Sequence, residues 1–363
     1  MIIKILSKTF VIFKLYTNVK VSHLNSRGKL FMKKIVTIAT LSLLALSSLL
    51  ADEVVKFDKN LVKERNNIGY KYEGPKIEWK VPDESTIPNN QFGDLIRYGK
   101  ELVSHTYKYI GPEVENKKMR FAGNNLACQS CHLDAGTKAY SAGFIGVFAN
   151  FPQYRPRENT IGTLADRING CMERSMNGKP LPLDSKEMKA MEAYMYWLSQ
   201  GIPIGAKVEG SSLAEVNRKM IQTTKADTDK GKVVYDTQCA ACHGANGEGV
   251  KNEGKANGYM YPPLWGKDSY NKGAGMYRTL KAMDFIKSNM PLGATHENPI
   301  LTDEEAYNVA AFMNMNEHKR PEKVNREKDF PDAAVKAPDT YIEGKDPIEK
   351  QVGPFGQFIK LNK

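Results

Sequence analysis

The sequence predicts an all-α protein in which two helical domains follow each other along the chain. The main observation is an internal repeat: two unequal copies of one plan, each with an amphipathic helix, a C-x-x-C-H motif, an irregular glycine-rich stretch and a closing helix. The length agrees with this, because 363 residues with 41% hydrophobic positions supply two cores of ordinary size. With 26% charged residues, the chain is too polar for a membrane protein with several spans.

An export signal precedes the repeat. Residues 32–51 have the order of a secretory signal peptide: a methionine with two lysines, an apolar run over residues 35–46, and Ala51 at the cleavage position. The run is shorter than the roughly 20 apolar residues that cross a bilayer. A retained membrane anchor is the alternative, because the residue two places before Ala51 is bulkier than usual. We expect a periplasmic protein without a stable membrane span after signal removal. Because the signal has its own methionine, Met32, we expect residues 1–31 to be a misassigned upstream extension.

Most of the chain's excess of basic over acidic residues lies in this leader. The formal net charge is +11, from 52 Lys and Arg against 41 Asp and Glu. Residues 1–51 contain eight Lys or Arg and no acidic residue, which leaves 44 against 41, or +3, in the rest of the chain. The composition therefore gives no support for a nucleic-acid partner.

The first copy of the repeat is predicted to occupy residues 52–206. Its opening helix is indicated by apolar residues close to helical spacing, namely Phe92, Leu95, Ile96, Leu102, Val103 and Ile110. Its closing helix is indicated by an apolar stripe, namely Met188, Met191, Met195 and Leu198. We expect Asp184 and Glu187 to cap the start of that helix.

The second copy is predicted to occupy residues 228–318. Residues 231–235 lead directly into its C-x-x-C-H motif, and the Thr-Asp-Glu-Glu sequence at residues 302–305 predicts the start of a closing helix. The residues expected to face inward on that helix are Ala306, Val309, Ala310 and Met313. Residues 207–227 are interpreted as a linker, and residues 319–363 as an extended tail that straps onto the domains.

Each C-x-x-C-H motif is an attachment site for c-type haem, in which both thiols add to vinyl groups and the histidine binds the iron. His132 and His243 are therefore the predicted proximal iron ligands. The residues that would form the thioethers are Cys128, Cys131, Cys239 and Cys242. A redox C-x-x-C would not require histidine next in both copies, and a zinc site would bring both cysteine pairs to one ion. We expect two covalently bound haem c groups, each with its iron.

The sixth ligand of the second iron is expected to be Met290. It lies 47 residues after His243 and ahead of the closing helix, and the proline that follows keeps it in irregular backbone that can reach inward. Methionine is more often core filler, and the competing residues are Met276, Met283 and Met313. A His/Met pair raises the reduction potential of a haem, which suits an electron exit.

The corresponding position of the first copy contains Cys171, the one cysteine outside the two motifs. From the residues alone, a lone cysteine is more often a small buried hydrophobe, and Met172 and Met176 compete with it as ligands. A thiolate ligand would lower the potential of this haem and place an oxidisable sulfur at the iron. The surrounding sequence is cationic, with Arg155, Arg157, Arg167 and Arg174. These arginines are interpreted either as anion ligands, as partners of haem propionates or as a solvated face.

With these residues in view, the sequence resembles a known family. The segment DRINGCMERSMNGK at residues 166–179, the two C-x-x-C-H motifs, Asn-Met-Pro at residues 289–291 and Gly-Pro-Phe-Gly at residues 353–356 are similar to the dihaem thiosulfate dehydrogenases. The similarity covers nearly all of the mature chain. It implies two cytochrome c folds in tandem, with a His/Cys-ligated active-site haem in the first and a His/Met-ligated haem in the second.

The resemblance also implies roles for single residues. Cys171 would be a catalytic iron ligand, and Arg157, Arg167 and Ser175 would bind the anionic substrate or support its binding. Some relatives have lysine directly before the methionine, where this chain has Asn289. A ligand exchange at the second haem is therefore a weaker expectation here.

The activity implied by the resemblance is the interconversion of two thiosulfate ions and one tetrathionate ion plus two electrons. In the hypothesised cycle, the Cys171 sulfur bonds the sulfane sulfur of one thiosulfate, a second thiosulfate attacks the adduct, and electrons leave through the second haem to a soluble cytochrome c or similar partner. The same steps in reverse make a tetrathionate reductase. The alternatives are a dihaem electron carrier without its own substrate and an S-thiosulfotransferase subunit that passes thiosulfate to a partner's cysteine. The Met-ligated second haem and the lack of a spare exposed cysteine favour the dehydrogenase.

Overall fold

The computed structural model describes residues 72–155, 157–158, 160–253, 258–315, 317–323, 329 and 347–359. The expected upstream extension, the expected signal peptide and the first part of the predicted first domain, up to residue 71, lie outside the described residues. Within the described ranges, no helix combines the length and the apolar character needed to span a bilayer.

Helices are the main regular elements of the segment around the first C-x-x-C-H motif. Its elements are η2 (Glu84–Thr86), α3 (Gln91–Ser104), α4 (Thr106–Ile110), η3 (Lys117–Met119), η4 (Cys128–Ser130), α5 (Leu133–Gly136), η5 (Phe148–Asn150), β1 (Gln153–Arg155), β2 (Thr160–Gly162), α6 (Leu164–Arg174) and α7 (Lys186–Leu198). Strands β1 and β2 pair antiparallel in a hairpin, with Tyr154 opposite Ile161.

Helices are also the main regular elements of the segment around the second motif. Its elements are α8 (Arg218–Thr223), α9 (Thr228–Val234), the π-helical turn η6 (Tyr235–Cys239), α10 (Ala240–His243), β3 (Val250–Lys251), β4 (Tyr259–Tyr261), η7 (Gly275–Tyr277), α11 (Thr279–Asn289), α12 (Asp303–Met313), α15 (Glu349–Val352) and α16 (Gly356–Ile359). In the described part of the chain, strands occur only as the two short hairpins β1–β2 and β3–β4. The prediction of an all-α protein is confirmed.

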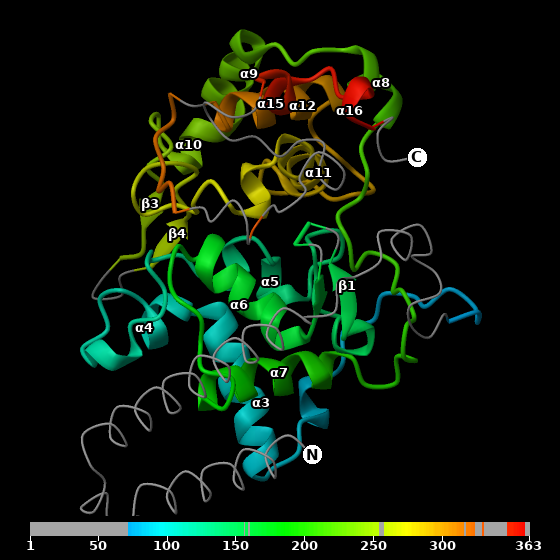
Figure 1. Cartoon of the computed structure of the whole chain (residues 1–363), viewed down its shortest axis with the longest axis vertical. Helices are drawn as coiled ribbons and strands as arrows, with labels where there is room; N and C mark the ends of the chain where they lie inside the picture. Colours follow the sequence, from blue (N-terminus) through cyan, green and yellow to red (C-terminus); the bar gives the residue numbers. More distant parts are fainter. Residues whose placement is uncertain are drawn as a thin grey trace, which may run out of the picture. The chain divides into compact units, whose positions relative to one another are not determined.

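The first hydrophobic core forms where α3 packs against α7 (Figure 1). The predicted stripes supply it, with the buried residues Ile96, Leu102, Val103, Ile110, Met188, Met191, Met195 and Leu198. Phe92, which the spacing predicted to face inward, is 43% exposed and lies edge-on against Tyr196. The predicted opening helix is also interrupted, because His105 has non-helical dihedral angles between α3 and α4.

The start of α7 differs from the prediction. Ser185, and not Asp184, is the N-cap residue, and its side chain accepts a hydrogen bond from the Met188 N–H at 3.2 Å. Glu187 lies in the first turn but turns inward, where its carboxylate accepts a hydrogen bond from the Tyr98 hydroxyl at 3.1 Å. A hydroxyl placed one residue nearer the helix reaches the free backbone N–H groups, which leaves Glu187 for the tertiary contact.

The second core forms around α9, α11 and α12 (Figure 1). The predicted start of α12 is confirmed: Thr302 is the N-cap residue, and it forms a capping box with Glu305. The residues predicted to face inward on α12, namely Ala306, Val309, Ala310 and Met313, are buried.

The described tail residues 347–359 join this second core. Val352 and Phe355 are buried in it, and two helical turns, α15 and α16, flank them. The Tyr307 hydroxyl donates a hydrogen bond to the Val352 carbonyl at 2.8 Å, and the Phe355 N–H donates to the Ile221 carbonyl at 2.8 Å. These two hydrogen bonds fix the end of the tail to α8 and α12.

A glycine marks the helix crossing in both copies of the repeat. A Cβ atom on Gly99 of α3 would lie 2.0 Å from the Ala190 carbonyl oxygen of α7, and one on Gly231 of α9 would lie 2.2 Å from the Asn308 carbonyl oxygen of α12. The opening helix therefore approaches the closing helix so closely that only a hydrogen atom fits between them.

Buried asparagines connect the two domains. The Asn124 amide donates to the Ser269 carbonyl at 3.1 Å, and the Asn289 amide donates to the Tyr140 carbonyl at 3.0 Å. Asn271 makes a similar bond to the backbone of α6 at 2.9 Å. Because an unpaired buried amide costs about 1–3 kcal/mol, these bonds favour one fixed arrangement of the domains.

We expect Gly99→Ala or Gly231→Ala to destabilise the domain that contains it by about 1–3 kcal/mol, the usual cost of overpacking. The added methyl group would meet carbonyl oxygens that belong to helix backbone and cannot turn aside. Urea unfolding of the haem-loaded protein measures the change. Gly275→Ala is the matched control, because a Cβ atom there has nothing within 4 Å. Equal unfolding midpoints for all three variants would contradict the close helix crossing.

Candidate active site

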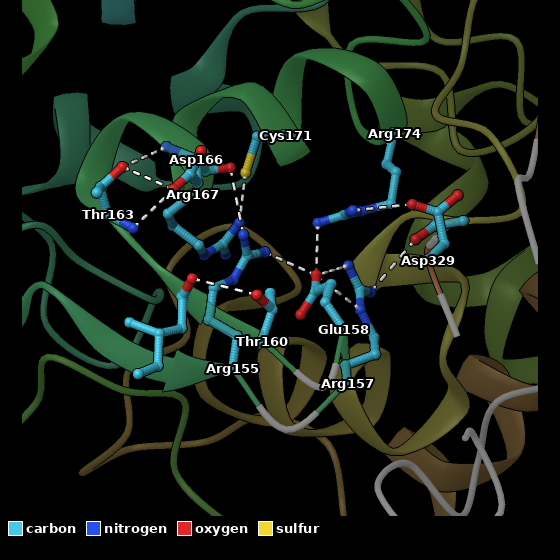
Figure 2. A network of polar contacts seen from close by, with 12 residues as sticks. Arg155, Arg157, Glu158, Thr160, Thr163, Asp166, Arg167, Cys171, Arg174 and Asp329 are labelled. Carbon is cyan, nitrogen blue, oxygen red and sulfur yellow. Dashed lines mark hydrogen bonds and ion pairs between the residues drawn. The ribbon is translucent and has the colours of Figure 1, made fainter. Parts of the chain in front are cut away.

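Helix α6 carries the central residues of the site on one face. Its start is fixed by a capping box: the Asp166 N–H donates to the Thr163 hydroxyl at 3.1 Å, and the Thr163 N–H donates to the Asp166 carboxylate at 2.8 Å. Residues at helix positions i, i+4 and i+7 share a face. This start therefore turns Arg167, Cys171 and Arg174 toward the β1–β2 hairpin (Figure 2).

Cys171 lies beside a guanidinium. Arg167 Nη1 donates a hydrogen bond to the Cys171 sulfur at 2.7 Å. Burial by itself would raise the pKa of the Cys171 thiol, but the charge of Arg167, followed by a hydrogen bond from His132, lowers that pKa to about 5. In return, the charge of Cys171 raises the pKa of Arg167. The site therefore stabilises a thiolate at this position.

Three cysteines of the two motifs behave in the opposite way. Burial raises the pKa of Cys128 to about 11, that of Cys131 to about 12 and that of Cys239 to about 11. The charge of Cys171 is a further cause for the first two, so Cys171 lies next to the first C-x-x-C-H motif. None of the five cysteines is joined to another. Among the thiols with a shifted pKa, Cys171 is the one that favours its anionic form.

Three arginines surround a single carboxylate, that of Glu158, which lies in the turn between β1 and β2 (Figure 2). Its Oε1 atom lies 2.6 Å from Arg155 Nη2, 3.1 Å from Arg157 Nη2 and 3.0 Å from Arg174 Nη2. Arg174 also pairs with Asp329 at 3.0 Å. We call the three residues Arg155, Arg157 and Arg174 the arginine cluster. All five side chains are largely buried.

Arg157 indicates that this cluster is short of negative charge. Burial lowers the pKa of Arg157 to about 9, the charge of Arg174 lowers it further, and Glu158 opposes both. Arg157 Nη1 also donates to the Gly273 carbonyl of the second domain at 3.3 Å. A guanidinium whose charged form is disfavoured gains from an added anion, and its planar fork matches an oxyanion.

Two glycines make room for these guanidiniums. A Cβ atom on Gly170 would lie 2.5 Å from Arg174 Nη2 and 3.3 Å from Arg155 Nη2. A Cβ atom on Gly162 would lie 2.5 Å from Arg155 Cδ. The glycine directly before Cys171 is therefore explained by the neighbouring guanidiniums.

The residues of the first motif fit a haem. The His132 Nδ1–H donates to the Ala142 carbonyl at 2.6 Å, which leaves Nε2 for a metal. Cys171 interacts with the same imidazole, so the two candidate axial ligands come from separate segments and meet at one place. The rival residues Met172 and Met176 are both buried in the first hydrophobic core.

The residues of the second motif fit a haem in the same way. The His243 Nδ1–H donates to the Pro262 carbonyl at 2.8 Å, and burial lowers the pKa of His243, which keeps the imidazole neutral for metal binding. Met290 follows the last residue of α11 in extended backbone and is partly buried, as is Met276, and both pack against the second core. The other two candidate ligands, Met283 and Met313, are enclosed within that core.

Arg320 supplies a further observation that fits a haem near the second motif. Its guanidinium is buried, with its carbon 4.4 Å from the ring centre of Tyr270 and 5.2 Å from that of Tyr277. Arg320 Nη2 donates to the Met313 carbonyl at 2.8 Å, but Nε and Nη1 have no hydrogen-bond partner among the described residues. A haem propionate is a carboxylate, and it would supply the hydrogen-bond acceptor that these two nitrogen atoms lack.

Ser175, which the resemblance named, lies at this site with its backbone bonded on both sides: its N–H donates to the Cys171 carbonyl at the end of α6, and its carbonyl accepts from the Asn124 amide at 2.9 Å. Sequence reasoning missed two residues of the site, Glu158 and Asp329. Glu158 follows Arg157 directly in the sequence, and that adjacent opposite charge was the available signal. Nothing local pointed to Asp329, which is 155 residues away from Arg174.

Comparison with known proteins agrees with these observations. The family model "SoxA/TsdA, cytochrome c domain" matches residues 117–204, and the model "Cytochrome c" matches residues 228–316. These matches confirm the predicted tandem cytochrome c domains and, with them, two covalently bound haem c groups.

Named relatives and a solved structure are also similar. The chain is 43% identical over 252 residues to a thiosulfate dehydrogenase of Psychrobacter arcticus, covering 69% of this chain and 71% of that protein. It is 40% identical over 259 residues to a thiosulfate dehydrogenase of Allochromatium vinosum, covering 70% of this chain and 88% of that protein. The structure of thiosulfate dehydrogenase (TsdBA) from Marichromatium purpuratum matches with a TM-score of 0.60 and 32% identity, covering 67% of this chain. This chain spans 50% of the length of that structure's chain.

We expect Gly170→Ala to weaken the binding of an inert oxyanion such as sulfate. The added methyl group would displace Arg174 and Arg155 from their common position, and the loss of one charge-assisted hydrogen bond, worth about 1.5–3 kcal/mol, corresponds to at least about a tenfold rise in the Kd. Calorimetric titration of the oxidised haem-loaded protein measures the Kd. The thermal midpoint is the control for folding, because alanine itself favours a helix. An unchanged Kd would show that the arginines do not depend on Gly170.

Proposed function

The chain belongs to the thiosulfate dehydrogenase family, and from this premise we propose that it is a dihaem oxidoreductase that interconverts two thiosulfate ions and one tetrathionate ion plus two electrons. The observation that carries the proposal is the position of Cys171, beside Arg167 and His132 and on the same helix face as the arginine cluster. This arrangement combines a nucleophilic sulfur with a site for anions.

Cys171 performs the covalent chemistry in this proposal. Its thiolate forms a bond with the sulfane sulfur of one thiosulfate, which gives a cysteine S-thiosulfonate and releases two electrons. When bound, the two haems supply one-electron acceptors for this pair. The sulfane sulfur of a second thiosulfate then attacks the adduct, tetrathionate leaves, and Cys171 returns to a thiolate without further change in electron count. Each step is reversible.

The arginines hold the anions during these steps. Arg157 and Arg167 present guanidinium donors to sulfonate oxygens, and Arg155 and Arg174 add positive charge nearby. Two thiosulfate dianions repel one another, so the second can approach the adduct only where fixed cations offset that repulsion. Ser175 supports the site through its bond to the Cys171 backbone.

Each of the two domains has its own role in this proposal. We assign substrate chemistry to residues 52–206 and electron exit to residues 228–318, joined by the linker 207–227, with the tail 319–363 attached to both. His132 and Cys171 would bind the first iron, and His243 and Met290 the second. A soluble cytochrome c or similar protein in the periplasm would accept the electrons, which agrees with the secretory signal in the sequence.

The direct test uses the purified haem-loaded protein alone, with thiosulfate and an artificial electron acceptor, and with tetrathionate and a reduced donor. The proposal expects both reactions. An electron carrier would fail both, and a transferase would need its partner protein.

In the same preparation, we expect Cys171→Gly to remove the spectroscopic signature of a thiolate-ligated low-spin haem and to abolish turnover, because the proposed ligand and the proposed nucleophile are one atom. The near-infrared band of the His/Met haem should stay. Met172→Leu and Met176→Leu are the matched controls and should keep the thiolate signature. Survival of that signature in Cys171→Gly would refute the ligand assignment whatever the activity does.

We expect Met290→Gly to separate the chemistry from the electron exit. Loss of the methionine should lower the potential of the second haem, and a fall of about 100 mV changes the distribution of electrons between the haems more than tenfold, since ~59 mV corresponds to tenfold. Thiosulfate oxidation should then slow more than tetrathionate reduction. The measurement is the ratio of the two rates under matched conditions. If both rates changed equally, or if the His/Met band persisted, Met276 would be the ligand to test next.

A further inference from the structure

Glu158 has a feature that the proposed reaction does not use. Its Oε1 atom alone takes the contacts from all three guanidiniums: Arg155 at 2.6 Å, Arg157 at 3.1 and 3.3 Å, and Arg174 at 3.0 Å. The side chain is 11% exposed, and it comes from the hairpin that faces α6 (Figure 2). An oxygen atom of a bound oxyanion would accept hydrogen bonds from the same N–H donors.

The charges around Glu158 define its effect. The three guanidiniums of the arginine cluster pair with two carboxylates, those of Glu158 and Asp329. Arg167, on the same helix face, contributes a fourth positive charge, and the Cys171 thiolate beside it contributes a third negative charge. These seven described groups therefore keep a net positive charge. The cluster therefore attracts anions, and Glu158 reduces that attraction by one full charge at the point where the guanidiniums converge.

We propose that the Glu158 carboxylate occupies an oxyanion position of the arginine cluster and keeps sulfur oxoanions from binding too tightly. The carboxylate competes with each incoming dianion for the same N–H donors. Tetrathionate can then leave, and abundant unreactive dianions such as sulfate do not block the site. This inference rests on the proposed function, because it gives the arginine cluster the role of binding the substrate anion.

A purely structural role for Glu158 predicts the opposite sign. If the carboxylate served only to gather the arginines, its removal would let them spread apart, and anions would bind more weakly. Glutamine separates the two cases, because it keeps the shape and an acceptor oxygen but removes the charge. Repulsion among the guanidiniums then rises, and a bound dianion relieves it.

The test is the affinity of the oxidised haem-loaded protein for sulfate, measured by calorimetry at constant low ionic strength, where such charges are little screened. We expect Glu158→Gln to lower the Kd for sulfate about tenfold. In the thiosulfate assay, the same variant should have a lower KM and a kcat that is equal or lower, because tighter binding of substrate and product does not speed the reaction. It should also be inhibited by sulfate at concentrations that leave the parent protein active.

Glu115→Gln is the matched control. Glu115 is exposed in the loop after α4, so this variant makes the same change in net charge away from the arginine cluster. Its Kd for sulfate should equal that of the parent protein. If Glu158→Gln is not obtained with its haems, Glu158→Asp decides: the shorter carboxylate reaches the guanidiniums less well, and the Kd should fall about two- to threefold.

An equal or higher Kd for sulfate in the Glu158 variants, or no saturable sulfate binding in any of the proteins, would overturn the inference. Sulfate binding requires no turnover, so this result is independent of the assay with thiosulfate. A protein that binds sulfate as expected but turns over neither thiosulfate nor tetrathionate would refute the proposed function and leave the competition by Glu158 in place.

Discussion

The contact between the Arg167 guanidinium and the Cys171 sulfur organises the first site, because it fixes the charge state of the sulfur. Without a neighbouring cation, burial raises the pKa of a thiol, as it does for Cys128 and Cys131 before haem attachment. At 2.7 Å from Arg167 and close to His132, Cys171 favours the thiolate instead. Both a metal ligand and a sulfur nucleophile must be thiolates.

A second consequence of this arrangement is the concentration of positive charge on one side of α6. Four guanidiniums lie near each other, and like charges held together in a poorly solvated place are unfavourable unless anions join them. Glu158 and Asp329 partly offset the repulsion. The positive charge that remains favours the binding of dianions, because each bound dianion reduces the repulsion, and the chain belongs to a family that acts on dianions.

The position of this site at the boundary between the domains matters for electron flow. Arg157 contacts the Gly273 carbonyl, and Asn271 contacts the backbone of α6, so the second domain touches the helix that carries Cys171. On another part of the boundary, the Asn289 amide donates a hydrogen bond to the Tyr140 carbonyl. Asn289 directly precedes the proposed ligand Met290 in the sequence. Buried polar bonds of this kind hold only in one relative position, which favours a constant separation between the two haem-binding segments.

The sequence by itself determined the features that depend on neighbouring residues. The two C-x-x-C-H motifs, the capping box at Thr302 and the apolar stripes of α3, α7 and α12 are local patterns, and haem attachment, helix capping and helix periodicity act over a few residues. These features could therefore be predicted without knowledge of the rest of the chain. Phe92 is the exception: it lies at the end of a helix, where packing against other elements decides burial, and it is exposed.

Only the tertiary structure decided which of these local features meet. The sequence left Cys171, Met172 and Met176 as competitors, and in the structure Cys171 lies near His132 whereas both methionines are buried in the first core. It offered four arginines without a common target. In the structure Glu158, the sequence neighbour of Arg157, also meets Arg155 and Arg174, and Asp329 comes from 155 residues away to pair with Arg174. The physical reason is that a sequence does not state how far apart two charged groups lie or how they are oriented, whereas their effect on a pKa or on an ion pair depends on both.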